Sequence, residues 1–354
     1  MSAAQLGLVT LGAGGDEVTA GPLWRKSAAG ISPAPNHPGV RFNVSSDPNN
    51  VVHVDALKRA SADWRQGVFG PQQWVLHSGL FHPQGSESPR NPDHFPNASL
   101  GYNGNPLLNW YILYFAEFVV RTLNECGEDL PDEVVIWNEP NLLAGNVSAG
   151  DTHQYADPAT GSALSPDVWG AMVHHVSQAI RQSTKVKVIR PGSYSLLLSM
   201  KTDPRSIWFQ GHWEQAIDYV NSVMGGGGLT LDGISLNMEG LVDTLSGAQY
   251  VAAAMRDVMA YGQWSGKLTI GEFGVPAGNL NAALVADTCS HLAQTMDEIF
   301  WYAHHVRQPG VLTGYGAQNY RYGADGTFEP TDQTALYPFL QKLFPYLRGA
   351  GPHP

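Results

Sequence analysis

The sequence has few cysteines, little charge and no long apolar run. Its two cysteines, Cys126 and Cys289, stand far apart in the 354 residues, both in segments predicted to be helical. This excludes a disulfide framework and a zinc ribbon or finger. No stretch approaches the roughly 18 consecutive apolar residues of a spanning helix, so we expect no membrane partner. Charged residues make up 14% and hydrophobic residues 43%, a composition that predicts a large folded core.

Positive charge is also scarce. Lysine and arginine number 20 against 31 aspartates and glutamates, which gives a formal net charge of −11. Because the sequence has no basic run, we expect no nucleic-acid partner. Residues 1–9 lack a basic stretch followed by a long apolar one, so no secretory leader is visible. A leader can be removed, so both a cytoplasmic and a secreted protein stay open, as does the oligomeric state.

Short apolar runs alternate with longer amphipathic ones along the chain. The short runs are rich in valine, isoleucine and leucine, which is typical of strands buried on both faces of a parallel sheet. The predicted strands are Leu6–Leu11, Val40–Val44, Gln73–His77, Glu133–Trp137, Val186–Arg190, Gly233–Leu236, Leu268–Gly271 and Val311–Gly314. The predicted helices are Val54–Gln66, Leu107–Asn124, Pro166–Gln182, Trp208–Met224, Ala248–Tyr261, Leu280–His305 and Gln333–Leu347, with a weaker one at Leu23–Ala29.

Eight strands alternating with about eight helices predict an α/β fold, a single (β/α)8 TIM barrel that forms one catalytic domain over residues 1–354. The alternative is an open doubly wound sheet, but its only candidate phosphate turn, Leu11–Gly15, lacks the G-x-G-x-x-G spacing. The stretches after the third and fourth strands, from Ser78 to Pro106 and from Pro140 to Ser165, are long. In a barrel such loops surround the active face, so we expect them to wall a cleft; the alternative is unstructured decoration.

Two of the predicted strands run directly into a glutamate. The fourth leads into Asn138-Glu139-Pro140, where the proline ends the strand and stiffens the turn. The seventh leads into Glu272, which has glycines nearby on both sides. Strands four and seven of an eight-stranded barrel stand across the lumen from each other. Two facing carboxyl groups suit glycosidic bond hydrolysis, in which one protonates the leaving oxygen and the other attacks the anomeric carbon or positions water.

The motifs Trp137–Asn141 and Gly271–Gly274 resemble those of glycoside hydrolase clan A, the retaining β-glycosidases with a TIM barrel. The strand-four motif is similar to family 39. The strand-seven motif, together with Val40–Phe42, is more similar to family 5. The resemblance implies that Glu139 is the acid/base and Glu272 the nucleophile of a two-step retaining mechanism. It also implies that Asn138 contacts the substrate 2-hydroxyl and that Arg41 lies beside the nucleophile.

The sequence departs from the clan pattern at two strands. The clan has His-x-Tyr at the end of strand six, where this chain has Asn237 and Glu239. The tyrosine of the clan commonly donates a hydrogen bond to the nucleophile, so Arg41 or Asn237 is expected to take that part, and the role of Glu239 stays open. After the predicted strand eight, Tyr315 follows where the clan has a tryptophan, and a tyrosine can also stack on a sugar.

The sequence therefore predicts a glycosidase that hydrolyses β-linked oligosaccharides, polysaccharides or small glycosides, with carbohydrate as its partner. A barrel that binds carbohydrate without hydrolysing it is the alternative, and a metal-dependent hydrolase is a weaker one. We expect no metal and no other cofactor. The histidine pairs His174–His175 and His304–His305 are adjacent on predicted helices, where neighbouring side chains point about 100° apart. The sequence does not indicate the preferred sugar or the choice between internal and terminal cleavage.

Overall fold

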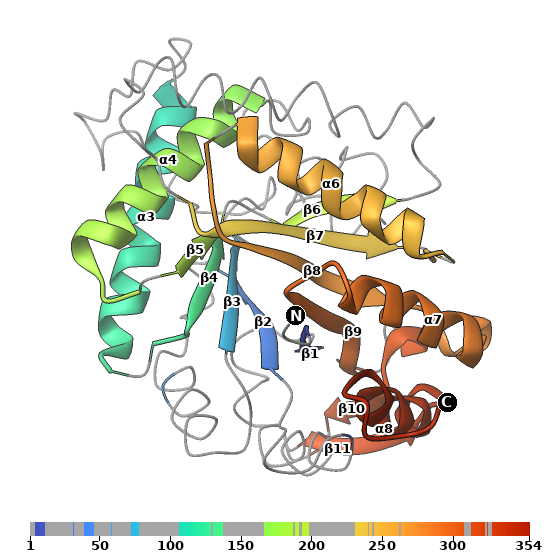
Figure 1. The fold of residues 1–354 in the computed structure, drawn as a ribbon. Helices are drawn as coiled ribbons and strands as arrows, with labels where there is room; N and C mark the ends of the chain where they lie inside the picture. Colours follow the sequence, from blue (N-terminus) through green and yellow to red (C-terminus); the bar gives the residue numbers. More distant parts are fainter. Residues whose placement is uncertain are drawn as a thin grey trace.

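A computed structural model gives the fold of the chain (Figure 1). It describes residues 4–10, 31, 39–45, 58, 72–77, 106–128, 130–136, 166–186, 188–190, 193–197, 231–239, 241–242, 244–261, 263–307, 313–322, 324 and 328–354. The strands in these residues belong to one sheet, and the helices lie outside that sheet.

The sheet closes into a barrel. Its parallel strands are β1 (Gln5–Thr10), β2 (Gly39–Ser45), β3 (Gln72–His77), β4 (Glu133–Ile136), β5 (Val188–Arg190), β6 (Ser193–Leu197), β7 (Gly233–Glu239), β8 (Lys267–Gly274) and β9 (Glu298–Arg307). They follow the order β5-β4-β3-β2-β1-β9-β8-β7-β6. β5 pairs with β4 and β6 pairs with β7, so the two short strands act as two parts of one barrel strand. The predicted (β/α)8 barrel is confirmed, and the open doubly wound sheet is wrong.

Asp232 joins β5 to the start of β7. The main-chain nitrogen of Asp232 donates to the carbonyl of Ile189 at 2.9 Å. In return, the nitrogen of Ile189 donates to Oδ2 of Asp232, also at 2.9 Å. Nη2 of Arg181 binds the same carboxylate oxygen at 3.1 Å. One aspartate therefore connects β5, at one end of the strand order, to β7 near the other end, and so closes the barrel.

Helices cover the outside of the barrel. They are α3 (Pro106–Cys126), α4 (Pro166–Ser183), α6 (Leu245–Tyr261), α7 (Ala282–Ala293) and α8 (Leu336–Leu347). In Figure 1, α3 and α4 lie beside β4 and β5, and α6 runs alongside β7. Val134 and Ile136 of β4 are buried in the same apolar cluster as Phe115 of α3 and Val176 of α4. None of the described helices combines the length and apolarity that crossing a bilayer requires.

Three of the eight predicted helices agree with the structure. The helices predicted at 107–124, 166–182 and 248–261 are confirmed as α3, α4 and α6. Cys126 and Cys289 lie in helices, as expected, and both are buried. The helices predicted at 23–29 and 208–224, and all but Lys58 of the one at 54–66, lie outside the described residues, as do the long segments after β3 and β4.

The prediction of the eighth strand is wrong. Residues 298–307 form β9 instead of the end of a helix from Leu280 to His305, and residues 313–315 form the 3-10 helix η7 (Thr313–Tyr315) instead of a strand. The helix stops early because Asp297 pairs with β8. The main-chain nitrogen of Leu268 donates to the carboxylate of Asp297 at 2.8 Å, and the main-chain nitrogen of Asp297 donates to the carbonyl of Leu268 at 2.9 Å. Apolar periodicity alone does not separate such a buried strand from a helix. His304 and His305 therefore lie on a strand.

A hairpin that the sequence did not predict extends the sheet beyond the barrel. β10 (Gln318–Tyr322) pairs in parallel with β9 and antiparallel with β11 (Phe328–Gln333). The helix predicted at 333–347 accordingly begins later, at Leu336. The hairpin and α8 lie close together at the lower right of Figure 1, near the C-terminus.

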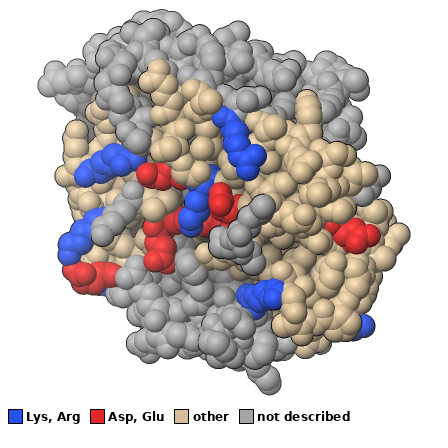
Figure 2. Space-filling view, viewed as in Figure 1, with Lys and Arg blue, Asp and Glu red and all other residues tan. Residues whose placement is uncertain are grey.

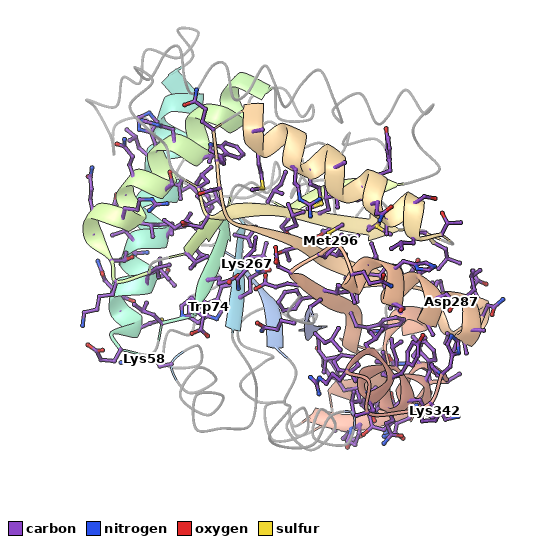
Figure 3. The ribbon with its side chains drawn as sticks, viewed as in Figure 1. Lys58, Trp74, Lys267, Asp287, Met296 and Lys342 are labelled. Carbon is purple, nitrogen blue, oxygen red and sulfur yellow. The ribbon has the colours of Figure 1, made fainter. Side chains whose placement is uncertain are left out.

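A polar cluster occupies the lumen where the strands begin. Nζ of Lys267 lies 3.0 Å from Oε1 of Glu133 and 2.5 Å from Oε1 of Glu298. The second oxygen of Glu133 accepts from Gln73 at 3.0 Å, and that of Glu298 accepts from Thr269 at 2.7 Å. We call these five residues the barrel floor. In Figure 2, basic and acidic side chains meet near the middle of the view, and Figure 3 places Lys267 there.

The barrel floor shows which strands face each other and which residues point inward. β4 and β8 are not neighbours in the sheet, so the contact between Glu133 and Lys267 crosses the lumen. Both carboxylates are buried, with side-chain exposures of 7% and 2%, whereas Lys267 is 46% exposed. Burial alone lowers the pKa of Lys267, but hydrogen bonds and charges from Glu298 and Glu133 outweigh it, so the pKa is raised and the ammonium persists.

Replacing Lys267 with methionine leaves two buried carboxylates without their shared cation. We expect Lys267→Met to lower the free energy of unfolding at pH 7 by about 3 kcal/mol, as for other broken buried ion pairs. Because one carboxylate can then take up a proton, the deficit should shrink as the pH falls towards 5. Urea unfolding at several pH values measures both effects.

Lys185→Met is the matched control, because Lys185 pairs with Glu128 in an exposed position where an ion pair contributes little. Equal destabilisation by the two substitutions, or a deficit of Lys267→Met that does not change with pH, would contradict the part assigned to the barrel floor.

The adjacent histidines of α4 make the fold sensitive to acid. His174 and His175 have ring centroids 5.2 Å apart. Burial, and then the nearby His174, lower the pKa of His175 from 6.5 to about 4. The unfolded chain therefore binds this proton at a higher pH than the folded chain does. The stability that the neutral ring contributes is complete above pH 6.5 and is lost as the pH falls from 6.5 towards 4.

We expect His175→Gln to remove this share of the acid sensitivity. Unfolding free energies of the two proteins, measured in urea between pH 7 and pH 4.5, should converge or cross on acidification if the variant starts less stable, and should diverge, with the wild type falling below the variant, if the two start equal. Parallel curves would show that His175 does not take up a proton on unfolding.

Candidate functional site

β8 contains one residue more than the strands on either side of it. Against β7, Leu236 pairs with Ile270, but the next pair is Asn237 with Glu272. On the other side, Ile270 pairs with Ile299 of β9, and Phe273 pairs with Trp301. Between these two pairs β8 advances by three residues, whereas β9 advances by two. This is a β-bulge at Gly271, a feature that redirects the side chains that follow it.

The bulge turns Glu272 towards the lumen. In an uninterrupted strand, residue 272 would share the face of Leu268 and Ile270, which are buried in the outer apolar cluster. The extra residue instead puts Glu272 on the face of Thr269, which belongs to the barrel floor. Phe273 then returns to the outer side, where its ring packs edge-on against Trp301 with centroids 5.8 Å apart. A half-buried carboxylate thus faces the lumen near the carboxyl end of β8.

Asn237 is the residue of β7 beside this carboxylate. It pairs in register with Glu272, and its exposure is only 3%. Ser235, two residues earlier on the same face, is fully buried and pairs with Thr269. The sequence predicted Asn237 as a substrate-binding residue or a donor to Glu272, and the strand register places these two residues side by side.

Two tyrosines meet beside the end of β8. Tyr302 of β9 has its carbonyl against Gly274, where an added Cβ would lie 1.8 Å from the oxygen. Its ring is 5.7 Å from that of Tyr315 in η7, at 68°. Sequence reasoning missed Tyr302 because it assigned residue 302 to a helix. If the segment had been assigned to a strand, the alternation of side chains would have placed Tyr302 on the lumen side together with Glu298 and Phe300.

The structure tests only part of the predicted site. Asn138 and Glu139 lie outside the described residues. Arg41 belongs to β2, where its backbone pairs with Val9 and Gln73, but its side chain is outside the described set. The same holds for the side chain of Glu239, which pairs with Gly274 at the end of β7. The structure therefore brings Glu272 together with Asn237.

The strand that precedes Glu139 lies across the lumen from the strand that carries Glu272. Glu133 begins β4 and Lys267 begins β8, and these two side chains meet in the barrel floor. Because the strands of the barrel are parallel, the ends at Ile136 and Gly274 lie at the same, opposite end of the barrel. Among the residues that the structure describes, no group of three or more histidines, cysteines, aspartates and glutamates is placed to hold a metal ion.

Comparison with known proteins finds likeness in structure but not in sequence. No protein-family model matches the chain, and no curated protein matches it by sequence. A β-glucosidase from Thermotoga maritima, solved with deoxynojirimycin, superimposes with a TM-score of 0.63 at 10% identity over 99% of both chains. A family 39 glycoside hydrolase from Bacteroides cellulosilyticus WH2 gives 0.52 at 12% identity over 96% of this chain and 63% of that one.

A third structure is similar in the same way. A mutant of xylanase 10C from Cellvibrio japonicus, in complex with xylopentaose, gives a TM-score of 0.50 at 12% identity over 97% of this chain and 67% of that one. The chain has the TIM-barrel fold of these glycosidases. At such low identity the likeness is one of fold, and this chain spans less than two thirds of the family 39 enzyme.

Gly274 holds Tyr302 in place, because no side chain fits between them. We expect Gly274→Ala to push the Tyr302 carbonyl away, to lower the unfolding free energy by about 1–3 kcal/mol and to weaken the tyrosine signal in near-ultraviolet circular dichroism. Gly278→Ala is the control, because an added Cβ there has nothing within 4 Å. If Gly274→Ala left both the melting temperature and the tyrosine signal unchanged, the close contact would be wrong.

Proposed function

We propose that this protein is a retaining β-glycoside hydrolase in which Glu272 is the nucleophile and Glu139 the acid/base. The observation that carries the proposal is the bulge in β8, because it turns the Glu272 carboxylate into the lumen at the carboxyl end of a barrel strand. Active sites of TIM barrels lie at that end. The fold shared with glycosidases supports the same reaction class.

The second carboxyl group is assigned from the strand that faces β8. Glu133 begins β4 and belongs to the barrel floor. Val135, the next residue on that face, is buried outside the outer cluster. Because every second side chain of a strand faces the same side, the alternation that begins at Glu133 predicts that residue 139 is on the lumen side. A retaining mechanism requires the two carboxyl groups to be about 5–5.5 Å apart, whereas about 6.5–9.5 Å is typical of inversion.

The reaction proceeds in two displacements. A carboxylate oxygen of Glu272 bonds to the anomeric carbon as the glycosidic bond breaks, and Glu139 gives its proton to the leaving oxygen. Glu139 then takes a proton from water, whose oxygen bonds to the anomeric carbon as the ester to Glu272 breaks. The net reaction adds one water, returns both glutamates to their starting states and leaves the sugar in the β configuration.

Sugar binding is assigned to groups around Glu272. The edge-on pair of Tyr302 and Tyr315 offers aromatic faces beside the carboxyl end of β8, and aromatic rings pack well against the C–H faces of sugars. Asn138 and Arg41 are proposed to bind the substrate hydroxyls and the nucleophile, respectively. Hydrolysis assays on aryl β-glycosides of glucose, xylose, mannose and galactose would identify the sugar bound at the cleavage site.

Removing the Glu272 carboxylate should abolish hydrolysis and allow chemical rescue. We expect Glu272→Ala to lower turnover of the best aryl β-glycoside by roughly 10⁴-fold or more. Azide fits into the space left by the carboxylate and attacks the same face of the sugar, so added azide should restore turnover and give the α-glycosyl azide. Nuclear magnetic resonance of the product identifies the anomer.

Glu139→Ala is the matched comparison. With an activated leaving group, the glycosyl-enzyme should still form on Glu272, and azide should then give the β-glycosyl azide. Full activity in Glu272→Ala, or the same azide anomer from both variants, would remove the two assignments.

A carbohydrate-binding barrel without hydrolase activity is the second candidate function. It is favoured by the end of β7, where Asn237 and Glu239 replace the histidine and tyrosine of the clan pattern. Calorimetry that shows oligosaccharide binding, with no product from the full aryl glycoside panel, would select it over the hydrolase.

A further inference from the structure

Asn237 and Phe300 occupy the strand positions on either side of Glu272. Asn237 pairs with Glu272 across the β7–β8 ladder. On β9, the residue at the same level is Phe300, which lies between Ile299, the partner of Ile270, and Trp301, the partner of Phe273. Phe300 follows Glu298 by two residues and is 2% exposed, so it fills the lumen side of β9 at this level. One neighbour of the carboxylate is therefore apolar, and the other is an amide.

The amide of Asn237 is a suitable partner for an ionised carboxylate. It carries two N–H donors and no charge, whereas an ionised carboxylate only accepts hydrogen bonds. Side chains paired on neighbouring strands begin about 5 Å apart, which an asparagine and a glutamate can span. At 3% exposure, the amide is almost out of reach of bulk water, so its donors must be satisfied inside the barrel.

We infer that Asn237 is a positioning residue for the nucleophile, with its side-chain N–H donating to the carboxylate of Glu272. The inference rests on the proposed function and adds the group that fixes the attacking oxygen. The hydrogen bond holds one oxygen of Glu272 and leaves the other directed towards the anomeric carbon. It also favours the ionised form of Glu272, which is the form that attacks.

Other titratable or charged groups lie on the elements around Glu272. They are Lys267 on β8, Glu239 on β7, Glu298, Tyr302, His304, His305 and Arg307 on β9, Arg41 on β2, and Glu133 and Glu139 at the start and after the end of β4. A comparison of variants at position 237 alone leaves all of them unchanged, so a difference between the variants reports the amide.

The test is the pH profile of kcat/KM for wild type, Asn237→Ala and Asn237→Asp. Loss of the donor makes the ionised nucleophile less favourable, so the acidic limb of the Asn237→Ala profile should move up by about one pH unit. Asn237→Asp has nearly the same shape but puts a second carboxylate beside Glu272, so its limb should move further. In both variants kcat should fall at least tenfold, with KM changed less than threefold.

Ser235→Ala is the matched control, because Ser235 is buried on the same strand and face, two residues earlier. Its acidic limb should stay in place even if its melting temperature falls. Acidic limbs of both Asn237 variants within 0.2 units of wild type would overturn the inference. A change confined to KM would overturn it too, because it would make Asn237 a substrate contact. Asn237→Asp keeps the test decisive if Asn237→Ala does not fold.

Failure of this inference is distinguishable from failure of the proposed function. Azide rescue of Glu272→Ala does not depend on Asn237, so rescue with an unmoved acidic limb would reject only the hydrogen bond. If no glycoside is hydrolysed, the contact is still measurable. The ¹³C carboxyl signal of Glu272, assigned by its absence in Glu272→Ala, should titrate at a higher pH in Asn237→Ala than in wild type, and equal titration would reject the contact.

Discussion

Each strand of a barrel presents alternate side chains to the lumen and to the helices, and one additional residue exchanges the two sets from that point on. In β8 the exchange occurs at Gly271. Without it, Glu272 would lie in the outer layer, among apolar groups such as Ile270, where an unpaired charge costs several kcal/mol. Phe273 would then face the polar lumen. The bulge places each side chain in a medium that suits it, and the position of Asn237 beside the carboxylate follows from the same shift in register.

The barrel keeps its charges at two levels. The floor holds Lys267 between Glu133 and Glu298, and the carboxyl end holds Glu272. Val135 on β4 and Phe300 on β9, which stands beside Glu272, are both buried. The ammonium of Lys267 pairs with the two carboxylates of the floor. The floor fixes β4 against β8, while the chemistry at the other end depends on the local groups around Glu272.

The sequence predicts features that local patterns encode, and it misses those that depend on distant partners. Apolar runs followed by a glutamate were sufficient to predict β8 and the place of Glu272. The bulge was not predictable, because it exists only relative to the registers of β7 and β9. The contact between Lys267 and Glu133 joins residues 134 positions apart, and no local sequence pattern predicts it. Tyr302 was missed because α7 and β9 together read as one apolar helix. The assignments of Glu139, Asn138 and Arg41 remain predictions.

Among the described strands, β5 and β7 form the weakest join of the ring. The other neighbouring strands of the described barrel meet through ladders of their own main-chain groups, whereas β5 reaches the start of β7 through Ile189 and Asp232. Pro191, between the two half-strands, has no N–H to contribute. Fluctuations that open the cylinder should therefore begin here. Opening this join turns the ring into one open sheet with β5 and β6 at its edges, so the amide protons of β5 would exchange with solvent sooner than those of β8.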